Sequence, residues 1–350
     1  MGSYKYFIKN KIPGLSYAFT ANGIELPVLD ITHPDFVSWT NDGLLEKLLP
    51  YVEKNAEENA AKFKKIPAFI KRFFAKRSFV MAELLQSGGE STFASGITTL
   101  MMKLGPELIG KGKKRFWDRQ VTKGFGALVI RMRVRDISKI QAESLIPLLE
   151  KNPGRNLCFV NIAGGSAADS INALFLTGKE NWEMLRNRKI EINVLDTDSF
   201  GPAFAEKSIE ALKQPGGKFA GLDVSFRHIH YDWNDPEKLS GILHLQQDWI
   251  QVISSEGGLF EYCSDEIIKR NLSVLSALSA GDAFIAGSLL HDITEVDAGI
   301  VAALKISTNI VPRFLGINGL KGIVERDKWQ IERIIEGNPR YQVFTLAKSK

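Results

Sequence analysis

A glycine-rich turn follows a short apolar run in the second half of the sequence. The run covers 157–163, and Gly164, Gly165 and Ser166 come next. Glycine lets a backbone turn sharply and approach a ligand closely, and the amides of such a turn and of a following helix can point at a ligand's polar groups. A turn of this kind also occurs in ordinary loops, so its interpretation depends on the neighbouring segments.

The next apolar run, 190–195, ends in an acidic segment made of Asp196, Thr197 and Asp198. A carboxylate at the tip of the second strand of a nucleotide-binding sheet can accept hydrogen bonds from both hydroxyl groups of a ribose. This position therefore supports a nucleotide site at the glycine-rich turn.

A third run, 224–231, ends in Tyr231, Asp232 and Trp233. These residues would give an adenine ring two stacking faces and a polar edge. Ligands of open parallel sheets bind outside the carboxyl ends of the strands. The three strand ends together therefore predict one adenosine site.

The spacing of the apolar runs predicts the fold that brings these ends together. Runs of strand length alternate with stretches long enough for crossover helices, which is typical of a parallel sheet covered on both faces. We expect an α/β protein with a Rossmann-like, doubly wound, mostly parallel sheet. Its expected strands are 157–163, 190–195, 224–231, 249–254, 283–290 and 341–347.

The first part of the chain has a different character. Residues 1–150 predict a mainly helical N-terminal domain that covers the site and contacts the substrate, and 151–350 predict the cofactor-binding domain. The turn Asn152-Pro153-Gly154 separates them. Apolar residues at helical spacing predict helices over 45–65, the basic amphipathic segment 69–79, the stretch around 100–104, and 137–149.

Charge is distributed unevenly along the chain. Residues 62–135 hold 17 Lys and Arg against four acids, a net of +13, within a total of +5, so the remainder carries −8. Such asymmetry suggests an anionic partner for the basic segment. The alternative is a basic face that packs against the acidic half of the same chain.

Several classes of protein are disfavoured by composition. The cysteines are Cys158 and Cys263, too few for a disulfide scaffold or a four-cysteine zinc site. The five histidines lack metal-ligand spacing, so no metal is expected. No apolar run approaches the roughly 18 residues of a membrane span, and the first residues lack a signal-peptide pattern, so we expect a cytoplasmic protein.

Residues 154–347 resemble the class I S-adenosylmethionine-dependent methyltransferases. The resemblance rests on NLCFVNIAGGSAAD, EINVLDTDS, RHIHYDWND, DWIQVISSEGGLFEY and LSVLSALSAGDAFIAGSLLHD. It implies S-adenosyl-L-methionine as cofactor, with Asp196 at the ribose and Asp232 near the adenine. The full set of expected cofactor-binding residues is Ala163, Gly164, Gly165, Ser166, Asp196, Thr197, Asp198, Tyr231, Asp232, Trp233 and Ser255.

The sequence departs from the family pattern in several places. Asn161 stands where the first motif usually has an acid, and Ala167 or Ala168 replaces a glycine. The 32 residues from Gly164 to Asp196 predict an insertion near 177–188. A single terminal strand is visible where the family fold has two. A dinucleotide-binding oxidoreductase is the alternative, although the GxGxxG spacing of that class is absent.

Methyl transfer from a sulfonium requires chiefly alignment and exclusion of water, and a general base is optional. Candidate catalytic residues near the expected site are Glu256, Tyr262 and His230, with His291 as a further histidine. The fourth strand lacks the Asn/Asp-Pro-Pro-aromatic signature of base amino methylation, and no Pro-Cys pair serves cytosine chemistry. Both absences argue against nucleic acid.

We therefore expect methyl transfer to a small molecule, with an anionic acceptor suggested by the basic segment. Two alternatives stay open. One is a methyltransferase for a lipid or membrane-associated acceptor, with peripheral membrane contact through 69–79. The other is a noncatalytic protein that binds the adenosine cofactor. A homo-oligomer is compatible with either.

Overall fold

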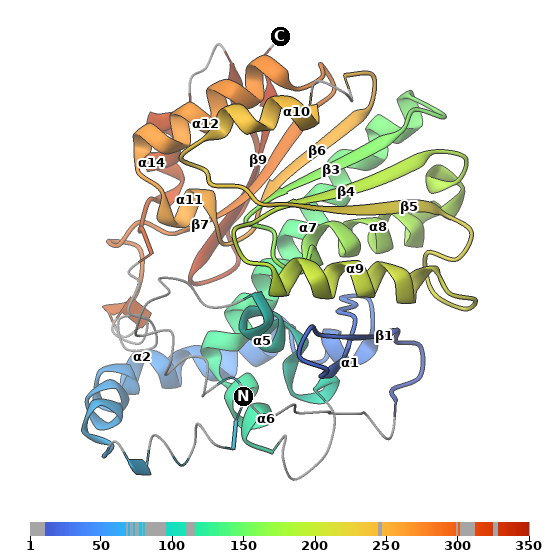
Figure 1. The fold of residues 1–350 in the computed structure, drawn as a ribbon. Helices are drawn as coiled ribbons and strands as arrows, with labels where there is room; N and C mark the ends of the chain where they lie inside the picture. The colour runs from blue at the N-terminus through green and yellow to red at the C-terminus, as the bar shows by residue number, and fades with distance from the viewer. Residues whose placement is uncertain are drawn as a thin grey trace.

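The protein is built on a seven-stranded sheet (Figure 1). The computed structural model describes residues 11–67, 69–70, 73, 77–78, 80, 96–109, 116–243, 247–298, 300–301, 312–324 and 328–349. The sheet has the order β5-β4-β3-β6-β7-β9-β8. Its strands are β3 (Leu157–Ile162), β4 (Lys189–Leu195), β5 (Asp223–Ile229), β6 (Ile250–Ser255), β7 (Phe284–Leu290), β8 (Trp329–Ile335) and β9 (Tyr341–Lys348).

The pairing of the strands is mostly parallel. The pairs β3–β4, β3–β6, β4–β5 and β6–β7 are parallel, whereas β9 lies antiparallel to both β7 and β8. The six expected strands are confirmed to within two residues at each end. The expectation of one terminal strand was wrong, because β8 is present as the sheet's edge strand beside β9.

The central strand β3 shows why both faces of the sheet are covered. All six of its residues are buried. Because side chains alternate along a strand, Leu157 and Phe159 enter the core on one face, and Cys158, Val160 and Ile162 enter the core on the other. A strand that is apolar on both faces requires helices above and below it.

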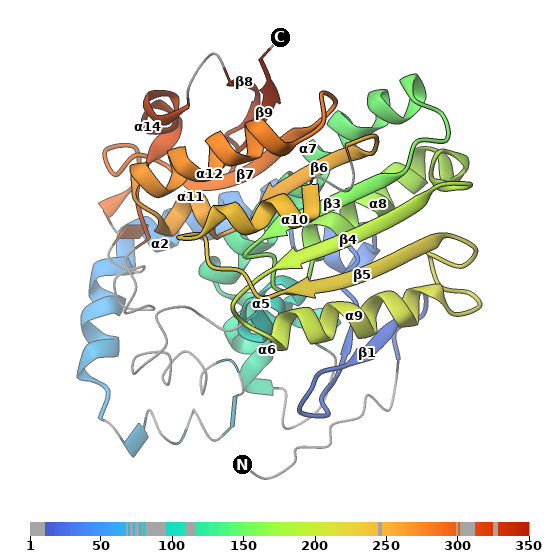
Figure 2. The ribbon, with the colours of Figure 1, turned by 45° about the horizontal axis from the view of Figure 1, so that its top comes forward.

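Two helical layers provide this cover. One face packs against α7 (Phe125–Lys151), α8 (Ala168–Asn181) and α9 (Phe200–Lys213). In Figure 2, α9 and the helices α10 to α12 lie on opposite sides of the strands. The second layer consists of α10 (Ser240–Leu243), α11 (Leu259–Tyr262), α12 (Asp265–Leu278) and α14 (Gly316–Ile323). The predicted doubly wound α/β fold is confirmed.

The helix expected over 137–149 is the second half of a longer helix, α7, which begins at Phe125. It contacts α8, β7 and β9, so it belongs to the layer on the sheet. The domain division at residues 150 and 151 stays a prediction.

The expected insertion near 177–188 corresponds to the end of α8 and the 3₁₀ helix η2 (Trp182–Leu185). A second 3₁₀ helix, η3 (Pro236–Leu239), follows β5.

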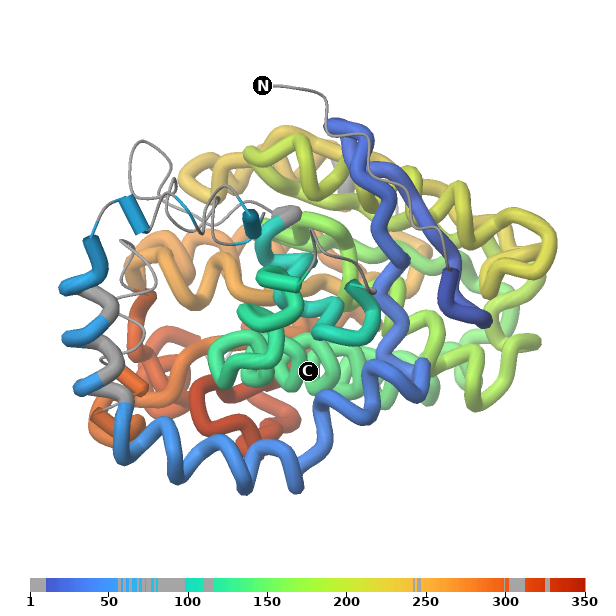
Figure 3. The backbone as a smooth tube through the Cα atoms, turned by 90° about the horizontal axis from the view of Figure 1, so that it is seen from below, coloured from blue at the N-terminus to red at the C-terminus, as the bar shows by residue number. Residues whose placement is uncertain are grey.

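The N-terminal elements gather on one side of the sheet, where Figure 3 shows them from below in blue and teal. The hairpin β1–β2 packs beside α9, and α5 contacts α6, α7 and α9. These elements are β1 (Tyr17–Phe19), β2 (Glu25–Pro27), α1 (Pro34–Val37), α2 (Asp42–Lys65), α5 (Gly96–Leu108) and α6 (Phe116–Lys123).

The basic segment 69–79 is described only in part. Phe69, Ile70, Phe73, Arg77 and Ser78 are described, whereas the remaining residues of the segment lie outside the described part of the chain. The Gly/Ser-rich stretch 87–96, which leads into α5 in the sequence, also falls outside it, except for Gly96. Among the described helices, none is long and apolar enough to cross a membrane.

Candidate functional site

The glycine-rich loop after β3 has an alternating backbone conformation. Ala163, Gly165 and Ala167 have φ values of 55°, 51° and 52°. This left-handed region costs a residue with a Cβ roughly 1–2 kcal/mol, whereas glycine adopts it freely. The loop therefore has three positions suited to glycine, and alanine occupies two of them. The sequence pattern indicates Ala167 or Ala168 as the residue that replaces a glycine, and of these Ala167 has the left-handed conformation. Ala163 is the other alanine in this conformation.

The tip of β4 is bound directly to this loop. The Gly165 amide donates to Asp196 Oδ2 at 2.9 Å, and the Asp198 amide donates to Asp196 Oδ1 at 2.9 Å. Burial raises the pKa of Asp196, against the lowering effect of these amides. The two strand ends that the sequence assigned to one site therefore lie together.

The residues after Asp196 lead into α9. Thr197 is exposed. The Asp198 carboxylate accepts hydrogen bonds from the Phe200 amide at 3.0 Å and from the Gly201 amide at 3.3 Å. Asp198 thus satisfies backbone donors at the start of the helix.

The third strand end differs from the expectation in detail. Tyr231 is buried, and its hydroxyl group donates to Asn271 Oδ1 at 2.8 Å, so this residue joins β5 to α12. Trp233 is half-buried and packs against the same core. Asp232 is exposed, and its Oδ1 accepts from Asn234 at 2.8 and 2.9 Å. Of the three, Asp232 is the exposed residue.

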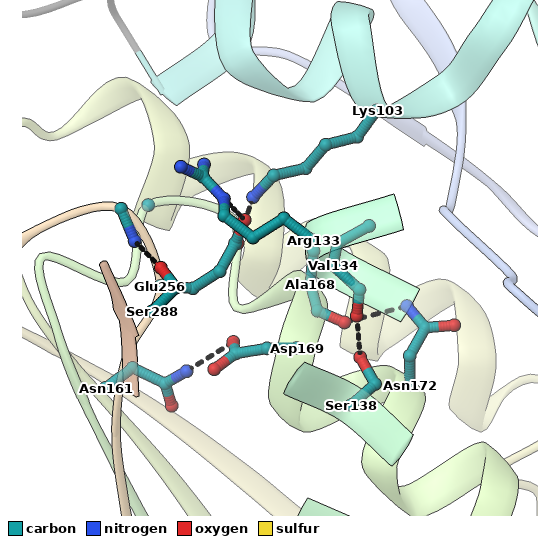
Figure 4. Close-up of polar contacts among 12 residues, drawn as sticks. Lys103, Arg133, Val134, Ser138, Asn161, Ala168, Asp169, Asn172, Glu256 and Ser288 are labelled. Atoms are coloured by element: carbon teal, nitrogen blue, oxygen red, sulfur yellow. Dashed lines mark hydrogen bonds and ion pairs between the residues drawn. The ribbon is translucent and has the colours of Figure 1, made fainter. Parts of the chain in front are cut away.

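A buried carboxylate that the sequence did not single out lies behind the loop. Asp169, in the first turn of α8, accepts from Asn161 Nδ2 at 2.6 Å (Figure 4). It also accepts from Gln141 Nε2 at 2.9 Å and from Ser254 Oγ at 2.7 Å. Burial raises the pKa of Asp169, and the donors of Ser254 and Gln141 oppose that rise. Asp169 places a carboxyl group beside Asn161, the position at which the resemblance implies an acid.

A second buried group lies where β6 ends. Glu256 Oε1 accepts from Arg133 Nε at 2.9 Å, and Glu256 Oε2 forms an ion pair with Lys103. Figure 4 shows Lys103 of α5 and Arg133 of α7 both reaching Glu256. Their side chains are 7%, 6% and 4% exposed for Lys103, Arg133 and Glu256. Helix α5 is therefore held against the carboxyl edge of the sheet.

Arg133 extends this arrangement to a fourth charged residue. Its Nη1 lies 3.1 Å from Glu261 Oε1, which also accepts from Ser288 Oγ at 2.9 Å. We call Lys103, Arg133, Glu256 and Glu261 the ionic cluster. Two cations and two carboxylates give it no net formal charge.

The expected catalytic residues are placed in unequal environments. Although burial opposes it, Lys103 and Arg133 lower the pKa of Glu256, so this carboxylate is a weak base. Burial raises the pKa of Tyr262, so its phenol stays protonated at neutral pH. His230 is exposed beyond the end of β5. His291 Nε2 lies 2.9 Å from the carbonyl oxygen of Asn338, at the turn before β9.

Ser255 completes the predicted set of ligand residues. It is the last residue of β6, it is buried, and its Oγ accepts from the Leu259 amide at 2.9 Å. Gly164 and Ser166 lie in the loop between the left-handed residues. Within the described residues, no cluster of three or more His, Cys, Asp or Glu side chains is arranged to hold a metal ion.

Comparisons with known proteins show the fold. No family model matches the chain, and no curated protein matches it. The chain is similar to the crystal structure of a possible exported protein from Bordetella parapertussis, with a TM-score of 0.55 and 11% identity over 87% of this chain and 97% of that one. This similarity supports the same architecture and leaves the activity open.

Weaker similarities connect the chain to methyltransferase structures. One is magnesium protoporphyrin IX methyltransferase from Synechocystis PCC 6803, at a TM-score of 0.42 and 15% identity over 73% of this chain and 94% of that one. Another is 1,6-didemethyltoxoflavin-N1-methyltransferase from Burkholderia thailandensis, at 0.38 and 12% over 62% and 79%. These scores are too low to carry an argument about this chain.

Proposed function

We propose that this protein is an S-adenosyl-L-methionine-dependent methyltransferase that acts on a small molecule. The observation that carries the proposal is the junction of the glycine-rich loop with Asp196. It joins a loop with three left-handed residues to the acid at the tip of the neighbouring strand, at the carboxyl edge where open sheets bind ligands.

The strand order supports this proposal over the dinucleotide-binding alternative. Counted along the chain, the seven strands lie in the order 3-2-1-4-5-7-6, with the last strand antiparallel to both neighbours. The dinucleotide-binding order is 3-2-1-4-5-6. The resemblance to class I methyltransferases implies two terminal strands, and β8 and β9 are both present at this end of the sheet.

The groups present fit such a cofactor. An ionised carboxylate has about four lone-pair sites, and Asp196 uses two of them for the amides of Gly165 and Asp198. Among the described residues these are its donors, so the other two sites are available to ribose hydroxyls. The exposed carboxylate of Asp232 suits the adenine's amino group. The loop 163–167 would lie against the remaining polar part of the cofactor.

S-adenosyl-L-methionine supplies an electrophilic methyl group when it is bound. This chain's part in an in-line displacement is to hold the acceptor in line and to exclude water. Neither Glu256 nor Tyr262 suits a general base at neutral pH, given the directions of their pKa shifts. We therefore propose transfer to an acceptor that is nucleophilic without proton removal by these two groups.

The acceptor is proposed to bind beside the cofactor at the carboxyl edge of the sheet, on the side where the N-terminal helices lie. Several described cations of the segment 62–135 already have carboxylate partners, among them Lys103, Arg119, Arg133 and Arg135. The partners of Arg119 and Arg135 are local, Glu107 and the adjacent Asp136. Lys103 and Arg133 reach Glu256 in the second half of the chain, which favours the interpretation that the basic segment packs against acids of the same chain. An anionic acceptor is therefore no requirement of the proposal.

A radiolabel-transfer screen tests the proposal. The protein is incubated with methyl-labelled S-adenosyl-L-methionine and pools of small-molecule acceptors, and transfer into one pool is expected. Binding of the cofactor with no transfer to any pool would favour the noncatalytic alternative. The Asp196→Ala variant is the control for transfer that does not depend on the site.

A membrane-associated acceptor is the second candidate, and exposed aromatic residues favour it. Phe69 is 72% exposed and Phe73 46% exposed, and the guanidinium of Arg77 lies 3.6 Å from the Phe73 ring centroid. Basic and aromatic side chains together are typical of membrane-surface contacts. Co-sedimentation with anionic vesicles at low and high salt tests it, and no co-sedimentation at either salt concentration would reject it.

A further inference from the structure

The start of α9 rests directly on the backbone of the glycine-rich loop. A Cβ atom built on Gly201 would lie 2.8 Å from both Cα and the carbonyl carbon of Gly165, and 3.2 Å from its carbonyl oxygen. Ordinary contacts of a Cβ begin near 3.4 Å. The atoms in the way are backbone atoms, so they cannot rotate aside as the end of a side chain can.

Hydrogen bonds hold this contact from both sides. Asp198 accepts from the amides of Phe200 and Gly201 and fixes the start of α9. Asp196 accepts from the amides of Gly165 and Asp198. The segment 196–201 therefore meets Gly165 twice, through a carboxylate and through the bare Cα of Gly201.

We propose that Gly201 is a positioning residue for cofactor binding. Because position 201 carries no side chain, α9 can lie against Gly165 and set the conformation of the loop 163–167. The cofactor part of this inference rests on the proposed function. The control of the loop by position 201 is a property of the free protein and can be tested without a ligand.

The substitution Gly201→Ala has a closely matched control in Gly126→Ala. Each glycine is the second residue of its helix and follows a phenylalanine, in α9 and in α7. A Cβ on Gly126 would meet nothing within 4 Å. Alanine is the better helix former, so Gly126→Ala is expected to raise the melting temperature slightly. At position 201, the contact must instead open by about 0.6 Å, the difference between 3.4 and 2.8 Å.

Two measurements test the proposal. Hydrogen–deuterium exchange of the peptide covering 163–168 is expected to be faster in Gly201→Ala and unchanged in Gly126→Ala. Titration calorimetry with S-adenosylhomocysteine is expected to give an affinity about tenfold or more weaker for Gly201→Ala, since the loss of one hydrogen bond to a displaced loop amide has an effect of this order. Gly126→Ala is expected to bind like the unaltered protein.

The outcomes distinguish the role of Gly201 from the proposed function. If Gly201→Ala exchanges like the unaltered protein and binds the ligand equally well, position 201 does not set the loop. If the unaltered protein binds no S-adenosylhomocysteine, the proposed function fails, and the exchange result alone decides the role of Gly201.

A second variant covers the case in which Gly201→Ala does not fold. Asp198→Ala removes the acceptor for the amides of Phe200 and Gly201. If α9 sets the loop, exchange rises in 163–168 together with the first turn of α9. A rise confined to α9 would overturn the proposal.

Discussion

Replacing Glu256 by glutamine removes a negative charge from the ionic cluster while keeping the shape of the side chain. Glu256 is 4% exposed and is shared between Lys103 and Arg133. Arg133 keeps Glu261 as a partner after the change. Lys103 has no second carboxylate within ion-pair distance among the described residues, so its ammonium group would be left buried and unpaired.

The size of the effect follows from this burial. Removing one partner of a buried ion pair leaves an uncompensated charge and costs about 3–5 kcal/mol. An exposed pair contributes little, because water already screens its charges. Glu237 and Arg270 form such a pair, with side chains 58% and 55% exposed. Glu237→Gln is therefore the matched control.

Urea denaturation followed by tryptophan fluorescence measures both variants at neutral pH. We expect a large fall in the unfolding free energy for Glu256→Gln and no measurable change for Glu237→Gln. If the unfolding free energy falls with urea at the same slope as in the unaltered protein, then unfolding exposes the same surface area in the variant. Equal stability of the two variants would refute the inference that the ionic cluster binds α5 to the sheet.

The pH dependence of the unfolding free energy tests the same ion pairs of Glu256. Lys103 and Arg133 hold the pKa of Glu256 below its ordinary value of 4.5 in the folded protein. Its stabilisation is then fully present above the unfolded pKa and is lost as the pH falls through the folded pKa. The difference between the unaltered protein and Glu256→Gln should therefore shrink as the pH is lowered to about 3. A difference that stays constant over this range would contradict the assignment.

Three further changes test the site. Asp196→Ala should weaken binding of S-adenosylhomocysteine by about 1–3 kcal/mol in calorimetry, because charge-assisted hydrogen bonds are lost; equal affinity in a folded variant would move the ribose role elsewhere. Ala163→Gly should cost less stability in thermal unfolding than Ala173→Gly by about 1–2 kcal/mol, since position 163 is left-handed and Ala173 is in the interior of α8; equal costs would show that the loop is unstrained. Once an acceptor is known, kcat/KM should change little with ionic strength, because Lys103 and Arg133, the cations of the basic segment at the carboxyl edge, are already paired with buried carboxylates; a steep fall with salt would restore electrostatic capture by the basic segment.

The fold was predictable wherever burial leaves a repetitive pattern. The apolar runs of β3, β4 and β7 are buried along most or all of their length, and each was found close to its observed bounds. β8 was missed because it is an edge strand in which exposed residues such as Glu332 and Ile334 alternate with half-buried ones such as Arg333. The first half of α7 was missed because it buries Arg131 and Arg133, residue types that a sequence pattern assigns to the surface.

The candidate site was predictable only where its residues directly follow strands. Asp196 lies at the tip of β4 and contacts Gly165, as strand order alone implies. The pairing of Lys103 with Glu256 joins residues 153 positions apart, and no local pattern indicates it. Asp169 gave a weak signal, as an acid in the first turn of a helix after a glycine-rich loop, although its three donors come from α7, β3 and β6.

We propose that the loop 163–167 and Asp196 form a site for S-adenosyl-L-methionine. Titration calorimetry of the unaltered protein with S-adenosylhomocysteine, and separately with a nicotinamide dinucleotide, tests it most directly. We predict saturable binding of S-adenosylhomocysteine that Asp196→Ala weakens, and no binding of the dinucleotide. Binding of the dinucleotide without any response to S-adenosylhomocysteine would contradict the claim.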